Sequence, residues 1–209
     1  GCVTGSPATS NTVTMSVNAA LAASVTISAS ANPICTGTSV TFTAVPVNGG
    51  SSPSYQWQLN GTNVGTNSAT FTSSTLNNND QIRVIMTSNA GCVTGSPATS
   101  NTVTMSVNFP LNAGTDGSTT VCESSSTAID LFSLITGEQA GGTWTRTSGT
   151  GGTFSAAAGT FTPALGATSY IFTYTVTGAA PCPNDQSIAT VNILQRTSPL
   201  FSPIAPLCQ

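Results

Sequence analysis

The sequence predicts an all-β protein made of tandem β-sandwich domains in an extended array, and three observations support this prediction. The segment GCVTGSPATSNTVTMSVN occurs at residues 1–18 and returns unchanged at residues 91–108. Short segments that alternate apolar and polar residues recur along the chain, separated by turn-forming Gly, Asn and Pro. Val, Ile and Thr are frequent, whereas only 4% of the residues are charged. The repeat therefore indicates small β domains joined one after another.

The repeat offset of 90 residues divides the chain into two whole domains with a fragment on each side. Residues 1–18 are predicted to be the last strand of an upstream domain, because VTMSV alternates with a period of two. Residues 19–108 and 109–194 are the two whole domains, and residues 195–209 begin a third one. Domains of about 90 residues bury a thin core, so a disulfide would add stability.

The first whole domain alternates strand patterns with turn signals such as Asn60-Gly61. Strands are predicted at 25–28, 39–45, 55–59, 63–64, 68–72, 81–87 and 103–107, with a long loop at 91–101. The predicted inward faces are formed by Val40, Phe42, Ala44, Tyr55, Trp57, Leu59, Ile82, Val84 and Met86. Trp57 falls where a β-sandwich has its central aromatic residue, and Tyr55 is predicted to join it in the core.

The second whole domain shares this outline with little sequence in common. Its strands are predicted at 127–134, 142–146, 152–154, 159–161, 169–177 and 187–193. SYIFTYTVT, which begins at Ser169, gives the clearest alternation and places Tyr174 in the core, and Trp144 takes the place of Trp57. The seven short strands of the first domain, in roughly 90 residues, match an immunoglobulin-like sandwich, and the second domain shares this outline.

Composition argues against several classes of function. The chain has no His and no Lys, so it lacks the usual general base, the commonest metal ligand and any Schiff-base lysine; no enzyme activity and no cofactor are expected. Three arginines and a pI near 4.2 do not provide the basic surface that nucleic acid requires. No apolar run approaches the roughly 18 to 20 residues that span a bilayer, so no membrane insertion is expected in these residues.

Possible ligand sites have simpler structural interpretations. Asp80 follows three asparagines, but one carboxylate is too few for calcium, and a turn is the better interpretation. Trp57 and Trp144 could stack on sugar rings, although their mid-strand positions favour the core. Asn60-Gly61-Thr62 matches the N-glycosylation pattern, and a turn explains it equally well. None of these is predicted to be a site.

The six cysteines are regularly spaced and indicate disulfides in an oxidising compartment. Cys2, Cys92 and Cys182 lie 90 residues apart, and Cys35, Cys122 and Cys208 lie 87 and 86 apart. In each domain the first cysteine lies before the second strand and the other lies just after the sixth. In an immunoglobulin-like sandwich these two strands run in the same direction, so the two cysteines of one domain would lie at opposite ends. A bond across the domain junction, Cys35 with Cys182, is therefore preferred.

The alternative is an intradomain pairing of Cys35 with Cys92 and of Cys122 with Cys182, which requires the loop at 91–101 to fold back along the sandwich. In the preferred scheme Cys92 pairs with an upstream equivalent of Cys35, and Cys122 pairs downstream. Cys2 and Cys208 would have partners outside these residues.

A family resemblance agrees with this interpretation. NPICTGTSVTFTAVPVNGGSSPSYQWQLNGTNVGTNSATFT, with TSNAGCVTGSPATSNTVTMSVN after it, resembles the immunoglobulin-like or PKD-like repeats of very large surface proteins of Bacteroidota, including gliding-motility adhesins. Residues 113–178 are similar to a second repeat type that accompanies them, and PLFSPIAPLCQ to the opening of a third. The resemblance implies type IX secretion, an extracellular location on the bacterial cell surface, and no catalytic residues.

Two functions are expected from different classes. In the first, the domains are structural spacers in the stalk of a secreted cell-surface adhesin or filament, stiffened by disulfides, with the neighbouring domains of the same chain as their partners. In the second, the repeats bind surface polysaccharide, or other copies of the chain, and associate laterally into a fibre or sheath. Exposed aromatic residues would favour binding, and buried ones the stalk.

Overall fold

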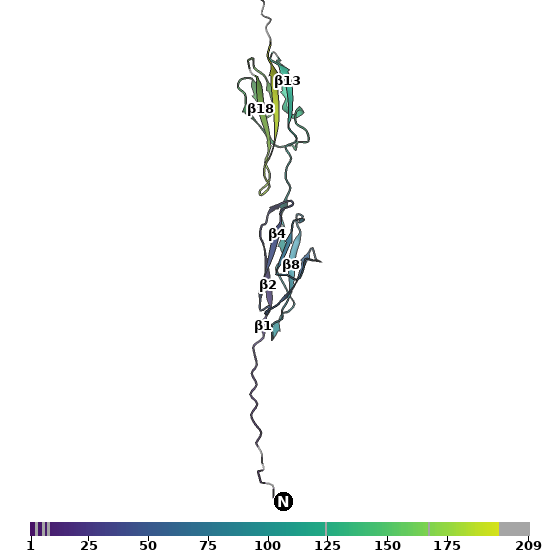
Figure 1. The fold of residues 1–209 in the computed structure, drawn as a ribbon, viewed down its shortest axis with the longest axis vertical. Helices are drawn as coiled ribbons and strands as arrows, with labels where there is room; N and C mark the ends of the chain where they lie inside the picture. Colours follow the sequence, from purple (N-terminus) through teal and green to yellow (C-terminus); the bar gives the residue numbers. More distant parts are fainter. Residues whose placement is uncertain (3, 6, 8, 124, 167, 197–209) are drawn as a thin grey trace, which may run out of the picture. The chain divides into compact units, whose positions relative to one another are not determined.

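The structure is a computed structural model that describes residues 1–2, 4–5, 7, 9–123, 125–166 and 168–196. The described residues form an all-β protein, with one 3-10 helix, η1 (Leu131–Ser133), as the helical element among them. They divide into two compact units, labelled on the ribbon by β2, β4 and β8 in unit 1 and by β13 and β18 in unit 2 (Figure 1). Among the described residues, unit 1 comprises those within 1–32 and 39–105, and unit 2 comprises those within 33–38 and 106–196.

Unit 1 is a sandwich of two sheets whose strand order is that of the immunoglobulin fold. One sheet has the order β2-β4-β7, formed by β2 (Ser24–Ala29), β4 (Val40–Val47) and β7 (Thr70–Ser73). The other has the order β10-β8-β5-β6, with β11 also on β8. Its strands are β5 (Ser54–Leu59), β6 (Thr62–Val64), β8 (Gln81–Thr87), β10 (Ala98–Thr99) and β11 (Val103–Thr104). In addition, β1 (Leu21–Ala22) pairs in parallel with β9 (Val93–Thr94).

The core of unit 1 lies between these sheets because each strand alternates its side chains between core and solvent. The buried apolar residues predicted from the alternation are confirmed at Val40, Phe42, Ala44, Trp57, Ile82, Val84 and Met86. Tyr55 and Leu59 are half-buried, so their prediction as inward residues was wrong in degree. Both lie on β5, where Trp57 alone is fully enclosed.

A closing segment, residues 99–105, completes unit 1 by binding along β8 and also reaching β2. Ser100 exchanges hydrogen bonds with Val84: its amide donates to the Val84 carbonyl and its hydroxyl accepts from the Val84 amide, each at 3.0 Å. The side-chain amide of Asn101 bonds to the backbone of Ile27, accepting at 2.8 Å and donating at 3.1 Å. Met105 donates its amide to the Asp80 carbonyl at 2.8 Å. Asn101 therefore links the two sheets of the sandwich.

Replacing Asn101 with alanine is expected to lower the free energy of unfolding of unit 1 by about 1 to 2 kcal/mol, because two hydrogen bonds to the Ile27 backbone are lost. Chemical denaturation of the full chain measures the change. The control is Asn11→Ala, since Asn11 is the same residue of the repeat and is exposed. Equal stabilities for the Asn101 variant and the unmodified chain would contradict the assigned link.

Unit 2 is a second sandwich with the same class of strand order. Its larger sheet has the order β13-β19-β18-β15, and its smaller one β14-β17-β16. The strands are β13 (Gly117–Cys122), β14 (Ile129–Asp130), β15 (Thr143–Ser148), β16 (Thr153–Ser155), β17 (Thr160–Thr162), β18 (Ser169–Val176) and β19 (Asp185–Leu194). The first strand, β13, runs parallel to β19 over its whole length.

The core of unit 2 is aromatic and contains one cationic side chain. Trp144, Phe132 and Tyr174 contact one another at centroid distances of 5.2 to 5.5 Å. The Arg146 guanidinium lies 5.2 to 5.8 Å from the ring centroids of Phe154, Phe161, Tyr170 and Phe172. Arg146 donates from Nη1 to the Gly151 carbonyl at 2.7 Å, so the guanidinium makes these contacts within unit 2.

Several predicted elements differ from the observed ones. The strand predicted at 127–134 is short, because the chain turns into η1, whose start is capped by the Asp130 carboxylate accepting from the Phe132 amide. Strand β13 was missed, since GSTTVC has little apolar alternation and is held by its partner β19. The loop predicted at 91–101 contains β9 and β10.

Residues 33–38 and 106–108 group with unit 2, and the domain boundary expected between residues 108 and 109 stays a prediction. Among residues 1–18, the described ones form no strand, and the assignment to an upstream domain stays a prediction. In the predicted third domain, residues 197–209 lie outside the described residues.

Candidate functional site

The candidate site is a disulfide in unit 2 that joins Cys35 to Cys182. The two residues lie 147 positions apart in the chain, and their Cα atoms are 5.0 Å apart. That distance is within the usual range for a bridged pair. This is the pairing preferred in the sequence analysis, and it connects the two separate stretches of chain that form unit 2.

Cys35 is part of unit 2 because its segment adds a short strand there. Strand β3 (Ile34–Cys35) pairs in parallel with β12 (Val107–Asn108). The pair continues on both sides: Ile34 donates its amide to the Ser106 carbonyl, and Thr36 donates its amide to the Asn108 carbonyl, each at 2.9 Å. The Ile34 side chain is 1% exposed. The chain therefore leaves unit 1 after β2, contributes residues 33–38 to unit 2, and returns to unit 1 for β4.

Asn108 positions the other half of the bridge. Its side-chain amide donates to the carbonyl of Ala180 at 2.7 Å and to that of Ala179 at 3.4 Å, just before Cys182 in the chain. The Cys182 amide donates to the Ala179 carbonyl at 2.9 Å, which closes a turn, and the cysteine is buried. Asn108 thus contacts the Cys182 loop with its side chain and pairs with Cys35 through its backbone.

Sequence reasoning missed the role of Asn108. Its signal was present, because Asn108 is the last residue of the duplicated eighteen-residue segment. A turn residue and a bridging residue look alike in a single sequence, and only the fold brings Asn108 next to Ala180.

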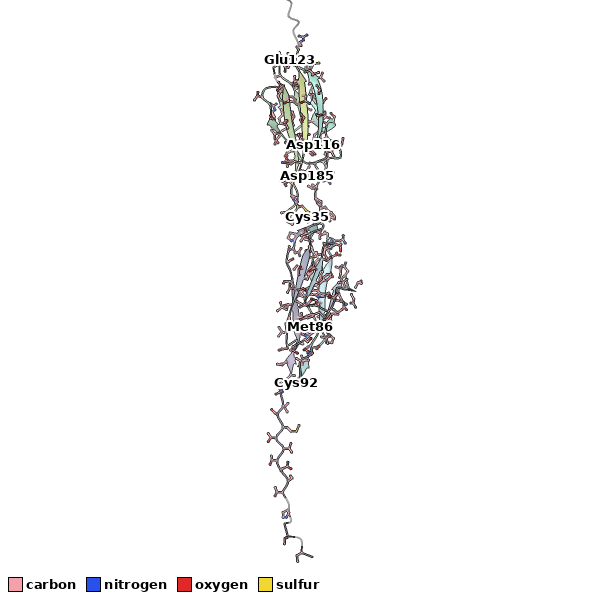
Figure 2. All side chains as sticks on the ribbon, viewed as in Figure 1. Cys35, Met86, Cys92, Asp116, Glu123 and Asp185 are labelled. Carbon is pink, nitrogen blue, oxygen red and sulfur yellow. A yellow bond between two sulfur atoms is a disulfide. The ribbon has the colours of Figure 1, made fainter. Side chains whose placement is uncertain are left out.

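The alternative intradomain pairing is wrong in this structure. Cys35 and Cys182 are bonded to each other, and Cys92 and Cys122 are free thiols. In unit 2 the reason is strand direction: Cys122 is level with Leu194 at one end of β19, whereas Cys182 precedes Asp185 at the other. A strand of that length spans about 30 Å, far beyond the reach of a disulfide. Figure 2 shows Glu123 and Asp185 at opposite ends of unit 2.

Cys122 has the same backbone setting as Cys35. Each is the last residue of a strand that pairs in parallel with another strand, Cys122 opposite Leu194 of β19 and Cys35 opposite Asn108 of β12. After Cys122, the Glu123 amide donates to the Leu194 carbonyl, as the Thr36 amide donates to that of Asn108. Three residues after each cysteine, an amide donates to the cysteine carbonyl at 3.0 Å. Cys122 is exposed, whereas Cys35 is bonded.

The other cysteines are placed as follows. Cys92 is exposed in unit 1 (Figure 2), and its carbonyl accepts from the Leu21 amide at 2.9 Å. Cys2 is also an exposed free thiol. Cys208 lies outside the described residues.

The predicted core aromatics do not form a binding surface for a sugar. Trp57 is 0% exposed and donates its indole N–H to the Ser68 carbonyl, and Trp144 is 3% exposed. Tyr174 is buried, and its hydroxyl donates to the Gln139 carbonyl. Tyr55 is half-buried. Phe109 is the one aromatic side chain with large exposure within the described ranges, at 64%.

A hollow of 250 Å³ lies in unit 1 between Asn60, Gly61, Gln81, Arg83 and Thr102. Most of its polar groups are already used: the Asn60 amide donates to the Asp80 carboxylate and accepts from the Gln81 amide. Arg83 donates to the side chain of Gln58 at 2.8 Å. Asp80 itself accepts from the Asn77 amide, which fits the predicted turn.

The described residues provide neither a metal centre nor a membrane-spanning helix. They contain no group of three or more His, Cys, Asp or Glu side chains placed to hold a metal ion. Within the same residues, no helix has the length and apolar character needed to cross a membrane.

The strand orders of the two units define a protein class, tandem immunoglobulin-like β-sandwiches. No protein-family model matches the sequence, and no curated protein sequence matches it significantly.

Among solved structures, the chain is similar to three N-terminal domains of the highly immunogenic outer capsid protein (Hoc) of bacteriophage RB49, at 13% identity and a TM-score of 0.41, covering 82% of this chain. It is also similar to extracellular domains 3–5 of Drosophila OTK (10% identity, TM-score 0.28, 81% of this chain) and to Drosophila N-cadherin EC1-3 (11%, 0.27, 84%). The chain spans 59%, 65% and 65% of the lengths of these three chains.

Proposed function

We propose that the chain is a structural spacer in an extracellular adhesin or filament on a bacterial cell surface, and that it has no enzyme activity. The observation that carries the proposal is the disulfide between Cys35 and Cys182. Such a bond persists in an oxidising compartment, which supports export. The family resemblance of the repeats further supports a Bacteroidota surface adhesin secreted by the type IX system.

The disulfide gives the chain a second covalent path that suits a load-bearing role. A force applied at the two ends runs along the backbone to Cys35, crosses the bond, and leaves along the backbone from Cys182. The 146 residues between them lie off this path, and they include most strands of both units. While the bond is intact, a force applied at the chain ends therefore does not extend these strands, even if they unfold.

Single-molecule stretching of the full chain, held at its termini, tests this role. The oxidised chain is expected to extend by about 50 nm less than the reduced chain, because 146 residues at about 3.3 to 3.6 Å each stay behind the bond. Cys122→Ser serves as the control, since Cys122 is a free thiol and its loss leaves the bond between Cys35 and Cys182 in place. Equal total extensions with and without reductant would refute the spacer mechanism.

The neighbouring domains of the same chain are the proposed partners. The matching settings of Cys35 and Cys122 support a second bond, from Cys122 to the cysteine of a following domain that corresponds to Cys182. By the same pattern, Cys92 bonds to a preceding domain's equivalent of Cys35. A small disulfide such as oxidised glutathione is the oxidant: two protein thiols form one disulfide, and two glutathione thiols are released.

A further inference from the structure

The two copies of the repeat are in opposite environments. The closing segment, residues 99–105, has the sequence TSNTVTM, and residues 9–15, called here the N-terminal copy, are identical to it. Met105 is 1% exposed in unit 1, whereas Met15 is 84% exposed. Val13 is 76% exposed, whereas its equivalent Val103 is half-buried and pairs with Ile82. The N-terminal copy therefore presents the side chains of a closing segment to solvent.

The residues that hold the closing segment define a specific binding site, called here the closing site. Its contacts come from the backbone of Val84 and Asp80 on the β8 side and from the backbone of Ile27 on β2. On the segment, the partners are Ser100, Asn101 and Met105. Because the N-terminal copy has serine, asparagine and methionine in the same register, a closing site makes the same contacts with either copy.

The described residues hold two copies of the segment and one closing site, which residues 99–105 occupy. We infer that the N-terminal copy binds a second closing site, which belongs to a sandwich body of the unit 1 type that has no closing segment of its own. Such a body supplies a β2-like strand and a β8-like strand, and it gains from the N-terminal copy the link between its sheets that Asn101 provides in unit 1. This inference does not depend on the spacer role.

Within a single chain, the closing site binds its own closing segment in preference to another copy. The closing segment is connected to its own site by a short stretch of backbone, so it has a large effective concentration there and outcompetes a segment from elsewhere. The unmodified chain is therefore expected to keep its own closing segment bound. In a chain with both of its copies weakened, the closing site is held less tightly by its own segment, and it becomes a receptor for the native segment added in excess as a peptide.

The test uses the full chain with four substitutions, Asn11→Ala, Met15→Ala, Asn101→Ala and Met105→Ala, and a fluorescent peptide of residues 9–18, TSNTVTMSVN. The peptide is expected to bind this variant saturably and to raise the melting temperature of its unit 1. A peptide with the Asn11→Ala and Met15→Ala changes should bind at least ten-fold more weakly. The unmodified chain, whose closing site is occupied, should also bind the native peptide at least ten-fold more weakly.

A folded four-fold variant that shows no saturable binding, or that binds both peptides equally, would overturn the inference. If that variant does not fold, recovery of its β-sheet circular dichroism on adding the native peptide supports the inference, and no recovery counts against it. The milder variant with only Met15→Ala and Met105→Ala is expected to stay folded and to show the same preference for the native peptide. Its failure to discriminate would likewise refute the inference.

Discussion

Replacing Trp57 with alanine is expected to lower the free energy of unfolding of unit 1 by about 3 to 5 kcal/mol, the usual cost of removing a fully enclosed large aromatic side chain. Trp57 is 0% exposed, and its ring contacts Phe42 and Phe71 at centroid distances of 6.4 and 5.9 Å. Its indole N–H donates to the Ser68 carbonyl at 2.9 Å. The substitution leaves a cavity between the sheets and the Ser68 carbonyl without its donor.

Thermal and chemical unfolding of the full chain measure this effect. The midpoint of unit 1 should fall by more than roughly 10 °C, because a domain of this size loses about 4 to 8 °C for each kcal/mol. Tyr55→Ala is the matched control, since Tyr55 lies on the same strand but is half-buried, and it should cost clearly less. Similar losses for the two variants would contradict the central place of Trp57 in the core.

Replacing Cys182 with serine is expected to destabilise unit 2 by about 2 to 5 kcal/mol. The bond closes a loop of 147 positions, for which the chain-entropy model gives about 5 kcal/mol, and the measured range for native disulfides is about 2 to 5 kcal/mol. Without it, residues 33–38 are held to unit 2 mainly by the short pairing of β3 with β12. Ile34, which is buried there, should then become transiently exposed.

Hydrogen exchange separates the local effect from the global one. The amides of Ile34 and Thr36, which donate to Ser106 and Asn108, should exchange much faster in the Cys182→Ser chain. Cys122→Ser should leave both their exchange and the unfolding midpoint unchanged, because Cys122 makes no disulfide. Unchanged exchange at Ile34 in the Cys182 variant would show that the strand pairing alone retains the segment.

The sequence was informative where a pattern is local. Alternation on β8 and β18 predicted both the strands and their buried faces, since a half-buried strand must alternate. The preferred cysteine pair also came from a simple argument. The strands next to the two cysteines of one domain run in the same direction, and one cysteine precedes its strand while the other follows its strand, so the two lie at opposite ends of the domain. Strand β13 was not visible in the same way, because its stability comes from β19 rather than from its own residues.

The closing segment and the N-terminal copy separate what the sequence by itself determines from what only the tertiary structure decides. The sequence determines the side chains, their alternation and the repeat, and these are identical in residues 9–15 and 99–105. The tertiary structure decides that Met105 is buried and hydrogen-bonded as part of a sandwich while Met15 is exposed. The physical reason is that a β-strand completes its backbone hydrogen bonds and buries its apolar face only against a partner. That partner is β8 for one copy, and we propose a second sandwich body for the other.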